Sequence, residues 1–341
     1  MNDPSDKAKI KSTNPVETFE ALWKVFNERY AFFDVRGVDW QKQKEIHRPQ
    51  VTDDATPEQL FEIMAKMIGP LKDGHVDLEA KGLKKYFNPE EKPRFWQEFD
   101  EGQIEELFAI TRSNLKAHGF SELKPTQTKI LQYAKSNDLA YLRIIELEGQ
   151  KWKRFRSALT DLEKDFANLK GYIIDLRECP GGDDEVLLEI LGRFVDKKRV
   201  AFHRKEKMAF DKYSELKTWY VEPKGASQFT GPVALLTNDA VFSGGEVFAM
   251  VARELPNVTI VGDRTNGIFS YQFDGKLPNG WTYNLSNQIY YSADMVCYES
   301  KGIPADIEVM NTKHNLDVKV DAVLNKAFST FAPGIAPFTE F

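Results

Sequence analysis

Two stretches in the first part of the chain place apolar residues at the three- and four-residue spacing of amphipathic helices. The first follows Asn14 and Pro15, and its apolar positions are Phe19, Leu22, Trp23, Phe26 and Tyr30. The second opens at "TPEQL", where Thr56 can cap, Pro57 suits the first turn and Gln59 completes a capping box. Its apolar positions are Leu60, Ile63, Met64, Met67 and Leu71. Stripes of this kind indicate the core of a helical domain rather than a cofactor site.

From about residue 130 onward, short apolar runs alternate with helical patterns. The runs predict strands at 139–147, 171–177, 232–237 and 258–262. Helical spacing between them predicts helices over 155–169, 185–195 and 246–255. Strands that alternate with helices indicate an α/β core with a largely parallel sheet. The stretch "WTYNLSNQIYYS" alternates and predicts an antiparallel addition, so the whole chain is expected to be of the α+β type.

These changes along the chain predict its domains. A length of 341 residues suggests about two of them. Residues 1–13 are polar and are expected to form a disordered tail. Residues 14–118 are expected to form an N-terminal helical domain with a charged and aromatic bridge, and residues 119–341 to form the α/β core.

Composition excludes several classes of protein. With 42% hydrophobic and 29% charged residues, the chain is expected to bury a full core. Its net charge of −6 gives no sign of a nucleic-acid partner, and the basic cluster "HRKEK" at 203–207 is interpreted as a solvated strand end. The chain has two cysteines, Cys179 and Cys297, which excludes a disulfide-rich scaffold and a CxxC zinc site. The sequence does not decide whether these two cysteines form a disulfide with each other.

The sequence gives few indications of the cellular location and the oligomeric state of the protein. No apolar run approaches the roughly 18 residues that a membrane span needs. The opening "MNDPSDKAKIKS" shows no signal peptide. A cytoplasmic location is therefore expected for the sequence as written, and an extracytoplasmic one if an export signal has been removed. The sequence is compatible with a homo-oligomer.

Two strand–glycine–helix turns carry the candidate chemistry. One is "IIDLRECPGGDDEVLLEIL", with Gly181 and Gly182, and the other is "VALLTNDAVFSGGEVFAMV", with Ser243 before Gly244 and Gly245. In a parallel sheet such loops lie at the carboxyl ends of strands, and each leads into a helix N-terminus that favours negative charge. If the two strands are neighbours, the loops form a backbone oxyanion site beside a serine hydroxyl.

Other interpretations stay open at this point. The glycines can be plain tight turns, and glycines before a helix can also cradle a phosphate. Neither loop has the Walker spacing with its lysine or a GxGxxG pattern, which argues against a nucleotide site. Cys179 is a rival nucleophile, because a nearby helix N-terminus would lower the pKa of its thiol. A small semi-buried thiol is the simpler interpretation of that cysteine.

A serine nucleophile needs a general base, and histidine is the usual one. The chain has five histidines, His47, His75, His118, His203 and His314. His75 lies in the turn "DGHVDL" after the helical stretch and is the favoured candidate, although taken alone a histidine there is more often a cap or a surface residue.

Four blocks in order resemble peptidase family S41, the family of C-terminal (tail-specific) processing proteases and the tricorn protease core. They are "GYIIDLRECPGG", "PVALLTNDAVFSGGEVFAMVAREL", "VTIVGDRTNG" and "YESKGIPADIEV". The helical front end, with "LKDGHVDL", is also similar to the family, so the likeness runs from about Asn14 to Val309. The resemblance implies a crotonase-like (ClpP-like) ββα core. Only about twenty residues, "HGFSELKPTQTKILQYAKSND", separate the bridge from the first core strand, too few for the PDZ domain that many tail-specific proteases insert there.

The resemblance also implies roles for individual residues. Ser243 matches the family's nucleophile, Gly244 matches one oxyanion donor, and the pair Gly181 and Gly182 matches the other donor without separating the two. Glu299 matches the glutamate that orients the base in the tricorn-like branch.

The general base is where the chain departs from part of the family. The Ser-Lys branch has a lysine where this chain has Ile268. The tricorn-like branch uses a histidine from the N-terminal segment, and His75 matches it. That branch places a serine before the histidine, whereas this chain has Gly74, so one member of the relay is absent or replaced.

The expected activity is peptide hydrolysis through an acyl-enzyme on Ser243, with His75 as the base and with peptides or unfolded proteins as substrates. No metal or organic cofactor is expected. Asp175 and Arg177 are expected to fix their loop, and Glu246 to bind backbone or an arginine. A function of another class stays open, because retinoid-binding relatives of this fold carry hydrophobic ligands and the chain could instead be a carrier or a peptide-binding module.

Overall fold

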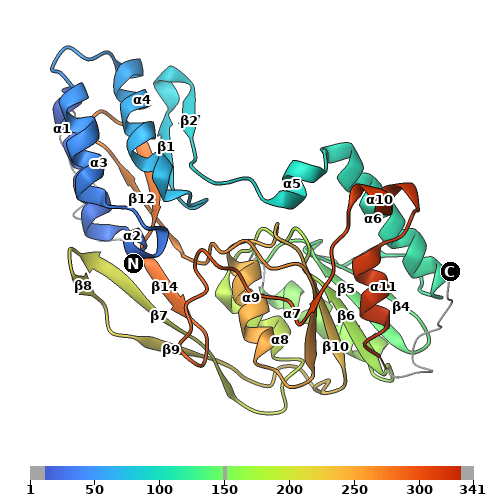
Figure 1. Cartoon of the computed structure of the whole chain (residues 1–341). Helices are drawn as coiled ribbons and strands as arrows, with labels where there is room; N and C mark the ends of the chain where they lie inside the picture. Colours follow the sequence, from blue (N-terminus) through green and yellow to red (C-terminus); the bar gives the residue numbers. More distant parts are fainter. Residues whose placement is uncertain (1–11, 149–151, 332–341) are drawn as a thin grey trace. The chain divides into compact units, whose positions relative to one another are not determined.

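The computed structural model describes residues 12–148 and 152–331 (Figure 1). The chain divides into two compact units, each assembled from separate stretches of sequence. Unit 1 comprises Met1–Glu91, Arg204–Lys217 and Ser270–Tyr290, and unit 2 comprises Lys92–His203, Thr218–Phe269 and Tyr291–Phe341. Helices and strands occur in both units, as the α+β expectation requires. Most of the expected tail, residues 1–11, lies outside the described residues.

The helices of unit 1 begin with the caps that the sequence predicts. Asn14 accepts a hydrogen bond from the Glu17 N–H ahead of α1, and Thr56 and Gln59 form a capping box ahead of α4. The apolar stripes face inward, so Phe19, Leu22 and Phe26 have no exposed surface. The helices are α1 (Pro15–Arg29), α2 (Phe33–Arg36), α3 (Trp40–His47) and α4 (Pro57–Ile68), with 3-10 turns η2 (Arg48–Gln50), η3 (Gly69–Leu71) and η4 (Lys81–Leu83).

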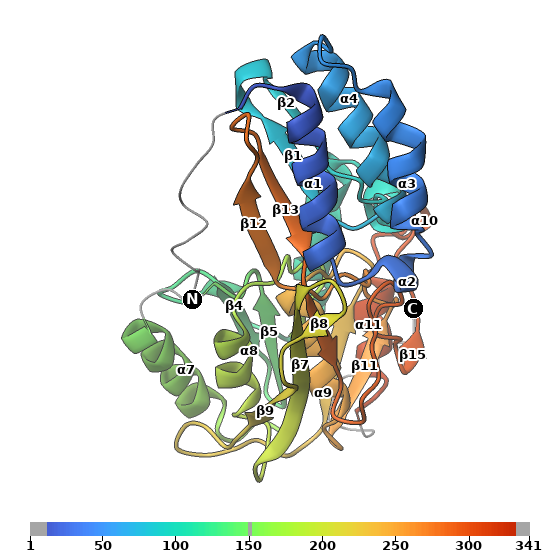
Figure 2. The ribbon, with the colours of Figure 1, turned by 90° about the vertical axis from the view of Figure 1, so that its left-hand side faces the viewer.

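An antiparallel sheet completes unit 1, and its strands come from distant parts of the chain. The order is β12 (Gln272–Lys276), β13 (Thr282–Ser286), β1 (Asp77–Ala80) and β2 (Lys85–Phe87). The sequence correctly predicts antiparallel pairing around 282–286, and β1 lies between β13 and β2 with Asp77 opposite Asn284. Helices α1 and α4 lie beside this sheet (Figures 1 and 2). Ring contacts join them, with centroids 6.2 Å apart for Phe26 and Tyr283 and 5.6 Å apart for Phe61 and Trp281.

Unit 2 contains the predicted largely parallel sheet. Its order is β15 (Ile307–Glu308), β11 (Val258–Gly262), β10 (Val233–Thr237), β6 (Gly171–Asp175), β5 (Leu139–Ile144), β4 (Leu131–Lys135) and β3 (Lys124–Pro125). Strands β5, β6, β10, β11 and β15 run parallel to their neighbours in that series. Every residue of β6 and β10 is buried, as continuous apolar strands covered on both faces require. Strands β6 and β10 are neighbours, so their carboxyl ends meet at one edge.

Helices cover both faces of this sheet. One face packs against a cluster that includes Leu115 of α6 and Leu324 and Phe328 of α11. Helices α8 and α9 pack on each other, and α9 packs on β11. The helices of unit 2 are α5 (Arg94–Glu98), α6 (Glu101–Ala117), α7 (Trp152–Phe166), α8 (Asp184–Leu191), α9 (Gly244–Arg253), α10 (Lys313–Asp317) and α11 (Ala322–Phe328).

Two sequence expectations differ from the structure. The expected boundary at residue 118 falls inside unit 2, because Ile104, Leu107 and Ile110 of α6 pack with Ala240 and Leu316 of that unit. The cluster "HRKEK" is not a solvated strand end: it lies within the long strand β7 (Arg199–Ala209). Lys207 within it is buried and donates to the Tyr30 carbonyl at 2.9 Å.

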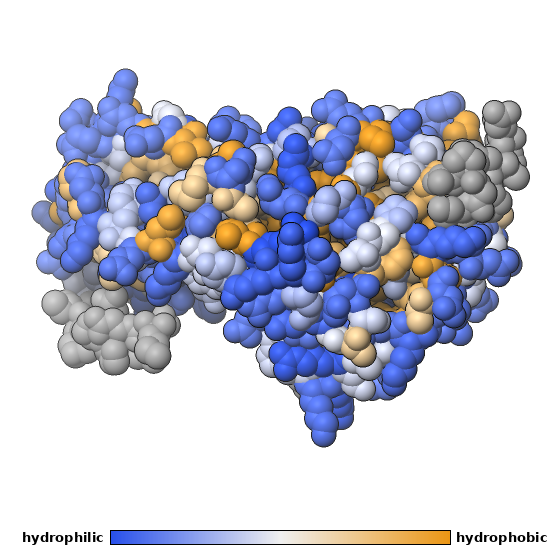
Figure 3. Space-filling view, turned by 90° about the horizontal axis from the view of Figure 1, so that it is seen from below, coloured by the Kyte–Doolittle hydropathy of each residue, from blue (hydrophilic) through white to orange (hydrophobic). Residues whose placement is uncertain are grey.

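Strand β7 belongs to a third sheet, at which the chain passes between the units. It pairs with β8 (Lys212–Tyr213), β9 (Lys217–Val221) and β14 (Gln288–Tyr291). The face seen in Figure 3 is mainly hydrophilic, with apolar residues in small separate groups. Among the residues that the structure describes, no helix combines the length and apolarity needed to cross a membrane.

Candidate functional site

Ser243 lies at the turn between β10 and α9, in a strained backbone conformation. Its φ is 53° and its ψ is −124°, values that a residue with a side chain rarely adopts. Such a conformation costs about 1–3 kcal/mol and persists where the surrounding structure enforces it. Three backbone contacts enforce it here: the Ser243 N–H donates to Ile268 O at 3.1 Å, and its carbonyl accepts from Glu246 and Val247 at 2.9 and 3.2 Å. The Ser243 side chain makes no capping hydrogen bond.

The loop between β6 and α8 packs directly on this turn, backbone against backbone. A Cβ added at Gly181 would lie 2.4 Å from Gly244 N and 2.9 Å from Ser243 Cβ. A Cβ added at Gly244 would lie 2.5 Å from Gly182 O and 2.8 Å from Gly182 N. Only residues without a side chain allow this approach. The two glycine turns that the sequence singles out therefore meet, with Ser243 between them and the start of α9.

The backbone N–H groups of the two loops have different partners. The Gly181 N–H acts to lower the pKa of the Cys179 thiol, and the Gly181 carbonyl accepts from Leu147 N at 2.7 Å. Within the described part of the chain, no hydrogen bond is recorded from the N–H of Gly182 or of Gly244. These two amides flank Ser243 as available donors, whereas sequence alone does not separate Gly181 from Gly182.

Glu246 fastens the segment that follows β11. Its buried carboxylate accepts from the N–H groups of Gly267 and Ile268, each at 2.6 Å, and from the Thr265 hydroxyl at 2.6 Å. Binding of backbone by Glu246 is one of the two roles that the sequence predicts. Because Ile268 O in turn accepts from Ser243 N, Glu246 helps to fix the strained serine turn.

Glu299 holds the next residue of the same segment. It is 1% exposed, and its Oε2 accepts from Phe269 N at 2.9 Å. Ser243 and Glu299 are thus joined through neighbouring residues Ile268 and Phe269, within unit 2. Ile268, which stands where the Ser-Lys branch has its lysine, is buried and offers no base.

Cys179 does not have the properties of a nucleophile. It is fully buried, and burial raises the pKa of its thiol to about 12. The helix N-terminus near it therefore does not lower that pKa, contrary to the expectation for a reactive thiol. No disulfide joins Cys179 to Cys297.

His75 belongs to unit 1, where it directly precedes β1. It is 4% exposed, and its N–H donates to Asp73 Oδ1 at 2.9 Å. Tyr30 donates to the other oxygen of Asp73 at 2.9 Å, which fixes the turn. Burial lowers the pKa of the His75 imidazole to about 4; Asp73 opposes this shift and Arg36 adds to it. His75 is therefore neutral at pH 7 and able to accept a proton.

Acid should destabilise the fold through His75. Its pKa is about 4 in the folded state, against an ordinary value of 6.5, so the unfolded chain binds more protons between these values. The stabilisation is present above pH 6.5 and is lost as the pH falls through that window. We expect the loss of unfolding free energy between pH 7 and pH 4.5 to be about 2 kcal/mol smaller in His75→Gln than in the native chain.

Denaturant unfolding at the two pH values measures this difference. His314→Gln, at an exposed position of α10, is the matched control and should show the native pH dependence. An identical pH dependence in His75→Gln and in the native chain would contradict the burial-induced shift.

Comparison with known proteins supplies the family. The profile of peptidase family S41 matches residues 138–309, which is half of the chain and includes both glycine turns. The chain belongs to peptidase family S41. The profile of the tricorn protease C1 domain matches residues 13–69, the helical part of unit 1.

Curated relatives of this S41 chain are processing proteases. It is 28% identical over 184 residues to the carboxy-terminal processing protease CtpA of Bacillus subtilis, a match that covers 54% of this chain and 37% of the relative. It is 26% identical over 190 residues to the carboxy-terminal-processing protease of Bartonella bacilliformis, covering 54% and 41%. The chain therefore matches less than half the length of these relatives.

A solved structure shares the fold of this S41 chain over nearly its whole length. It comes from Parabacteroides merdae, is described only as a candidate peptidase, and superposes with a TM-score of 0.79 at 24% identity. The superposition covers 94% of this chain and 97% of the other. The helical N-terminal region and the α/β core thus occur together in another protein.

Proposed function

We propose that this chain is a serine peptidase that cleaves polypeptides through an acyl-enzyme on Ser243. The observation that carries the proposal is the strained Ser243 turn, packed against a second glycine loop, with the Gly182 and Gly244 amides unengaged beside it. Strained backbone at a serine in a strand-to-helix turn is typical of nucleophiles. The peptidase relatives support the same reaction and do not favour a carrier of hydrophobic ligands.

The proposed reaction begins with proton transfer from the Ser243 hydroxyl to His75 as Oγ attacks the peptide carbonyl. The carbonyl oxygen becomes an oxyanion, which the N–H groups of Gly244 and Gly182 stabilise. His75 returns the proton to the departing amine, leaving an acyl group on Ser243. A water molecule then repeats the sequence on the ester, releases the acid and restores the hydroxyl.

His75 is proposed as the base on its match to the family and on its chemical state. The imidazole is neutral at pH 7, although a pKa of about 4 makes it a weaker base than an ordinary histidine, so the assignment depends on the match to the histidine of the tricorn-like branch. The assignment requires that unit 1 presents His75 to Ser243, which the experiment below tests. Glu299 is proposed to orient the base, as in the tricorn-like branch, with Gly74 standing where that branch has a serine.

Active-site labelling tests the proposal directly. A fluorophosphonate reacts with a serine only when that hydroxyl is activated, so we expect adduct formation at Ser243, located by peptide mapping. His75→Ala should slow labelling by about 10²-fold or more, because general-base assistance is typically worth 10²–10⁴. His314→Ala, an exposed histidine elsewhere in the chain, should label at the native rate.

Two outcomes would contradict the proposal. An unlabelled Ser243 in the native chain would exclude an activated nucleophile, and tight binding of a retinoid or fatty acid by the same sample would then support a carrier. Equal labelling of the native chain and His75→Ala would remove His75 from the mechanism while leaving Ser243 as the nucleophile.

A further inference from the structure

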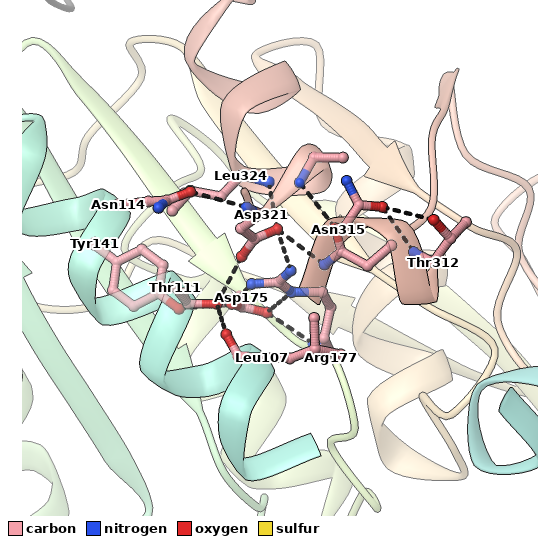
Figure 4. A network of polar contacts seen from close by, with 12 residues as sticks. Leu107, Thr111, Asn114, Tyr141, Asp175, Arg177, Thr312, Asn315, Asp321 and Leu324 are labelled. Carbon is pink, nitrogen blue, oxygen red and sulfur yellow. Dashed lines mark hydrogen bonds and ion pairs between the residues drawn. The ribbon is translucent and has the colours of Figure 1, made fainter. Parts of the chain in front are cut away.

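The glycine loop, defined here as residues 178–182, begins directly after a buried cluster of charged side chains (Figure 4). Asp175 ends strand β6, and Arg177 is the last residue before the loop. Arg177 Nε donates to Asp175 Oδ1 at 2.9 Å, and Nη2 donates to Oδ2 at 2.6 Å. Tyr141 of β5 donates to Asp175 Oδ2 at 2.6 Å. Tyr141 thus holds the Asp175 side chain against strand β5, and two hydrogen bonds hold the Arg177 side chain on Asp175.

The remaining guanidinium nitrogen of Arg177, Nη1, bonds to a residue that is distant in the sequence. Nη1 donates to Asp321 Oδ1 at 2.8 Å, across a sequence separation of 144 residues. Asp175 and Asp321 have no exposed surface and Arg177 is 6% exposed, so the three charges lie away from solvent. Removing Arg177 from this set would leave two buried carboxylates without a cation, whereas neutralising Asp321 leaves a balanced pair of Arg177 and Asp175.

Asp321 is itself held from several sides. It precedes helix α11, and its Oδ1 accepts from Leu324 N at 3.0 Å as an N-cap. Asn311 donates to the same oxygen at 3.0 Å, and the Thr111 hydroxyl of α6 lies 2.6 Å from Oδ2. The Asp321 N–H donates to Asn114 Oδ1 at 2.9 Å. These contacts fix the carboxylate to α6 and α11 before it meets Arg177.

The charge state of Asp321 suits this role. Burial acts to raise the pKa of its carboxyl, but Arg177, Thr111 and Leu324 outweigh burial and the net pKa is lowered. Asp321 is therefore ionised at pH 7. Arg177 stays protonated between two carboxylates.

The position of the glycine loop depends on where Arg177 sits. Glu178 follows it with a φ of 65°, and its N–H donates to Asn238 Oδ1 at 3.2 Å. Asn238 lies in the turn that leads to Ser243, so this bond joins the two loops. Between Arg177 and Gly182 only four residues intervene. A shift of the Arg177 backbone would therefore reach the Gly182 amide.

We propose that Asp321 is a positioning residue that holds the glycine loop, and with it the Gly182 amide, at Ser243. The proposal rests on the serine peptidase function proposed above. Asp321 touches neither the serine turn nor a substrate: it acts through Arg177. The C-terminal segment that carries α11 thereby contributes to the geometry of the site.

Asp321→Asn is the variant that tests the proposal. Asparagine caps a helix as well as aspartate does, and Arg177 keeps Asp175 as a balanced partner, so the fold should be retained. We expect kcat for a peptide substrate to fall about 10- to 100-fold with KM unchanged within about 2-fold, because a small misplacement of a catalytic donor affects the transition state.

The control variant is Thr111→Val. It removes one of the two other side-chain contacts to the Asp321 carboxylate and leaves those from Asn311 and Arg177. A purely structural role of Asp321 predicts that both variants lose stability and that kcat per folded molecule is native in both. A positioning role predicts a lowered kcat in Asp321→Asn alone.

Hydrogen exchange at the bonded amides of Glu178, Cys179 and Asp183 gives a readout that does not depend on activity. We expect these amides to exchange at least about tenfold faster in Asp321→Asn than in Thr111→Val or the native chain. If Asp321→Asn does not fold, Arg177→Lys replaces it as the test. Lysine keeps the positive charge but lacks the several N–H donors of the guanidinium, so the same amides should exchange faster than in the native chain. Native exchange in the loop would overturn the proposal. An inactive native chain with faster loop exchange in the variant would overturn the peptidase function alone.

Discussion

Ser243→Ala is expected to abolish peptide hydrolysis while leaving the fold intact. Without the hydroxyl no acyl-enzyme forms, and loss of a catalytic serine typically lowers kcat by about 10⁶-fold. The Ser243 side chain makes no capping hydrogen bond, so its removal should change the unfolding free energy by less than about 0.5 kcal/mol. Hydrolysis of a fluorogenic peptide and thermal unfolding of the same preparations measure the two effects.

Ser300→Ala is a close control for that variant. Ser300 also has a positive φ, 59°, and is exposed. It shares the residue type and the strained backbone but is assigned no chemistry, so its hydrolysis rate should be native. Substantial hydrolysis by Ser243→Ala would exclude Ser243 as the nucleophile.

Gly181→Ala is expected to cause the second largest loss. The added methyl group would lie 2.4 Å from Gly244 N and 2.8 Å from Phe242 O, both backbone atoms that can move only if the serine turn moves. The φ of 98° adds strain of about 1–3 kcal/mol. Displacing the Gly244 amide removes an oxyanion donor, so kcat should fall by about 10²–10³-fold or more.

The matched control is Gly119→Ala. Gly119 has a φ of 77°, but an added Cβ would meet nothing within 4 Å. This variant carries the backbone strain without the collision, and it should lose stability while keeping its kcat. Comparable kcat values for the two variants would show that the close approach of the glycine loops has no part in catalysis.

The fold is readable from the sequence where a local rule determines it. The capping box at Thr56 and Gln59, the buried strands β6 and β10, and the glycine turns after them follow from spacing and residue type alone. The meeting of the two turns follows only with the pairing of β6 and β10, because parallel neighbours put their carboxyl ends at one edge. Glu246, one helical turn after Ser243, is expected to bind backbone or an arginine, and it binds backbone.

Long-range pairing is what the sequence does not reveal. The glycine pattern shows two turns but not that the Gly181 N–H acts on the Cys179 thiol. The sequence analysis does not single out Asp321, and nothing local indicates its bond to Arg177. The fully buried state of Cys179 reverses the pKa shift that a helix N-terminus suggests, because desolvation depends on packing from the whole of unit 2.

The pairing of β1 with β13 has a consequence for the newly made chain. Asp77, two residues after the proposed base, lies opposite Asn284, so the sheet beside His75 stays incomplete until residues beyond 284 leave the ribosome. Asp321, the anchor of Arg177, is synthesised later still. The sheet of unit 1 and the buried cluster around Arg177 are therefore completed only after residue 321 has been synthesised.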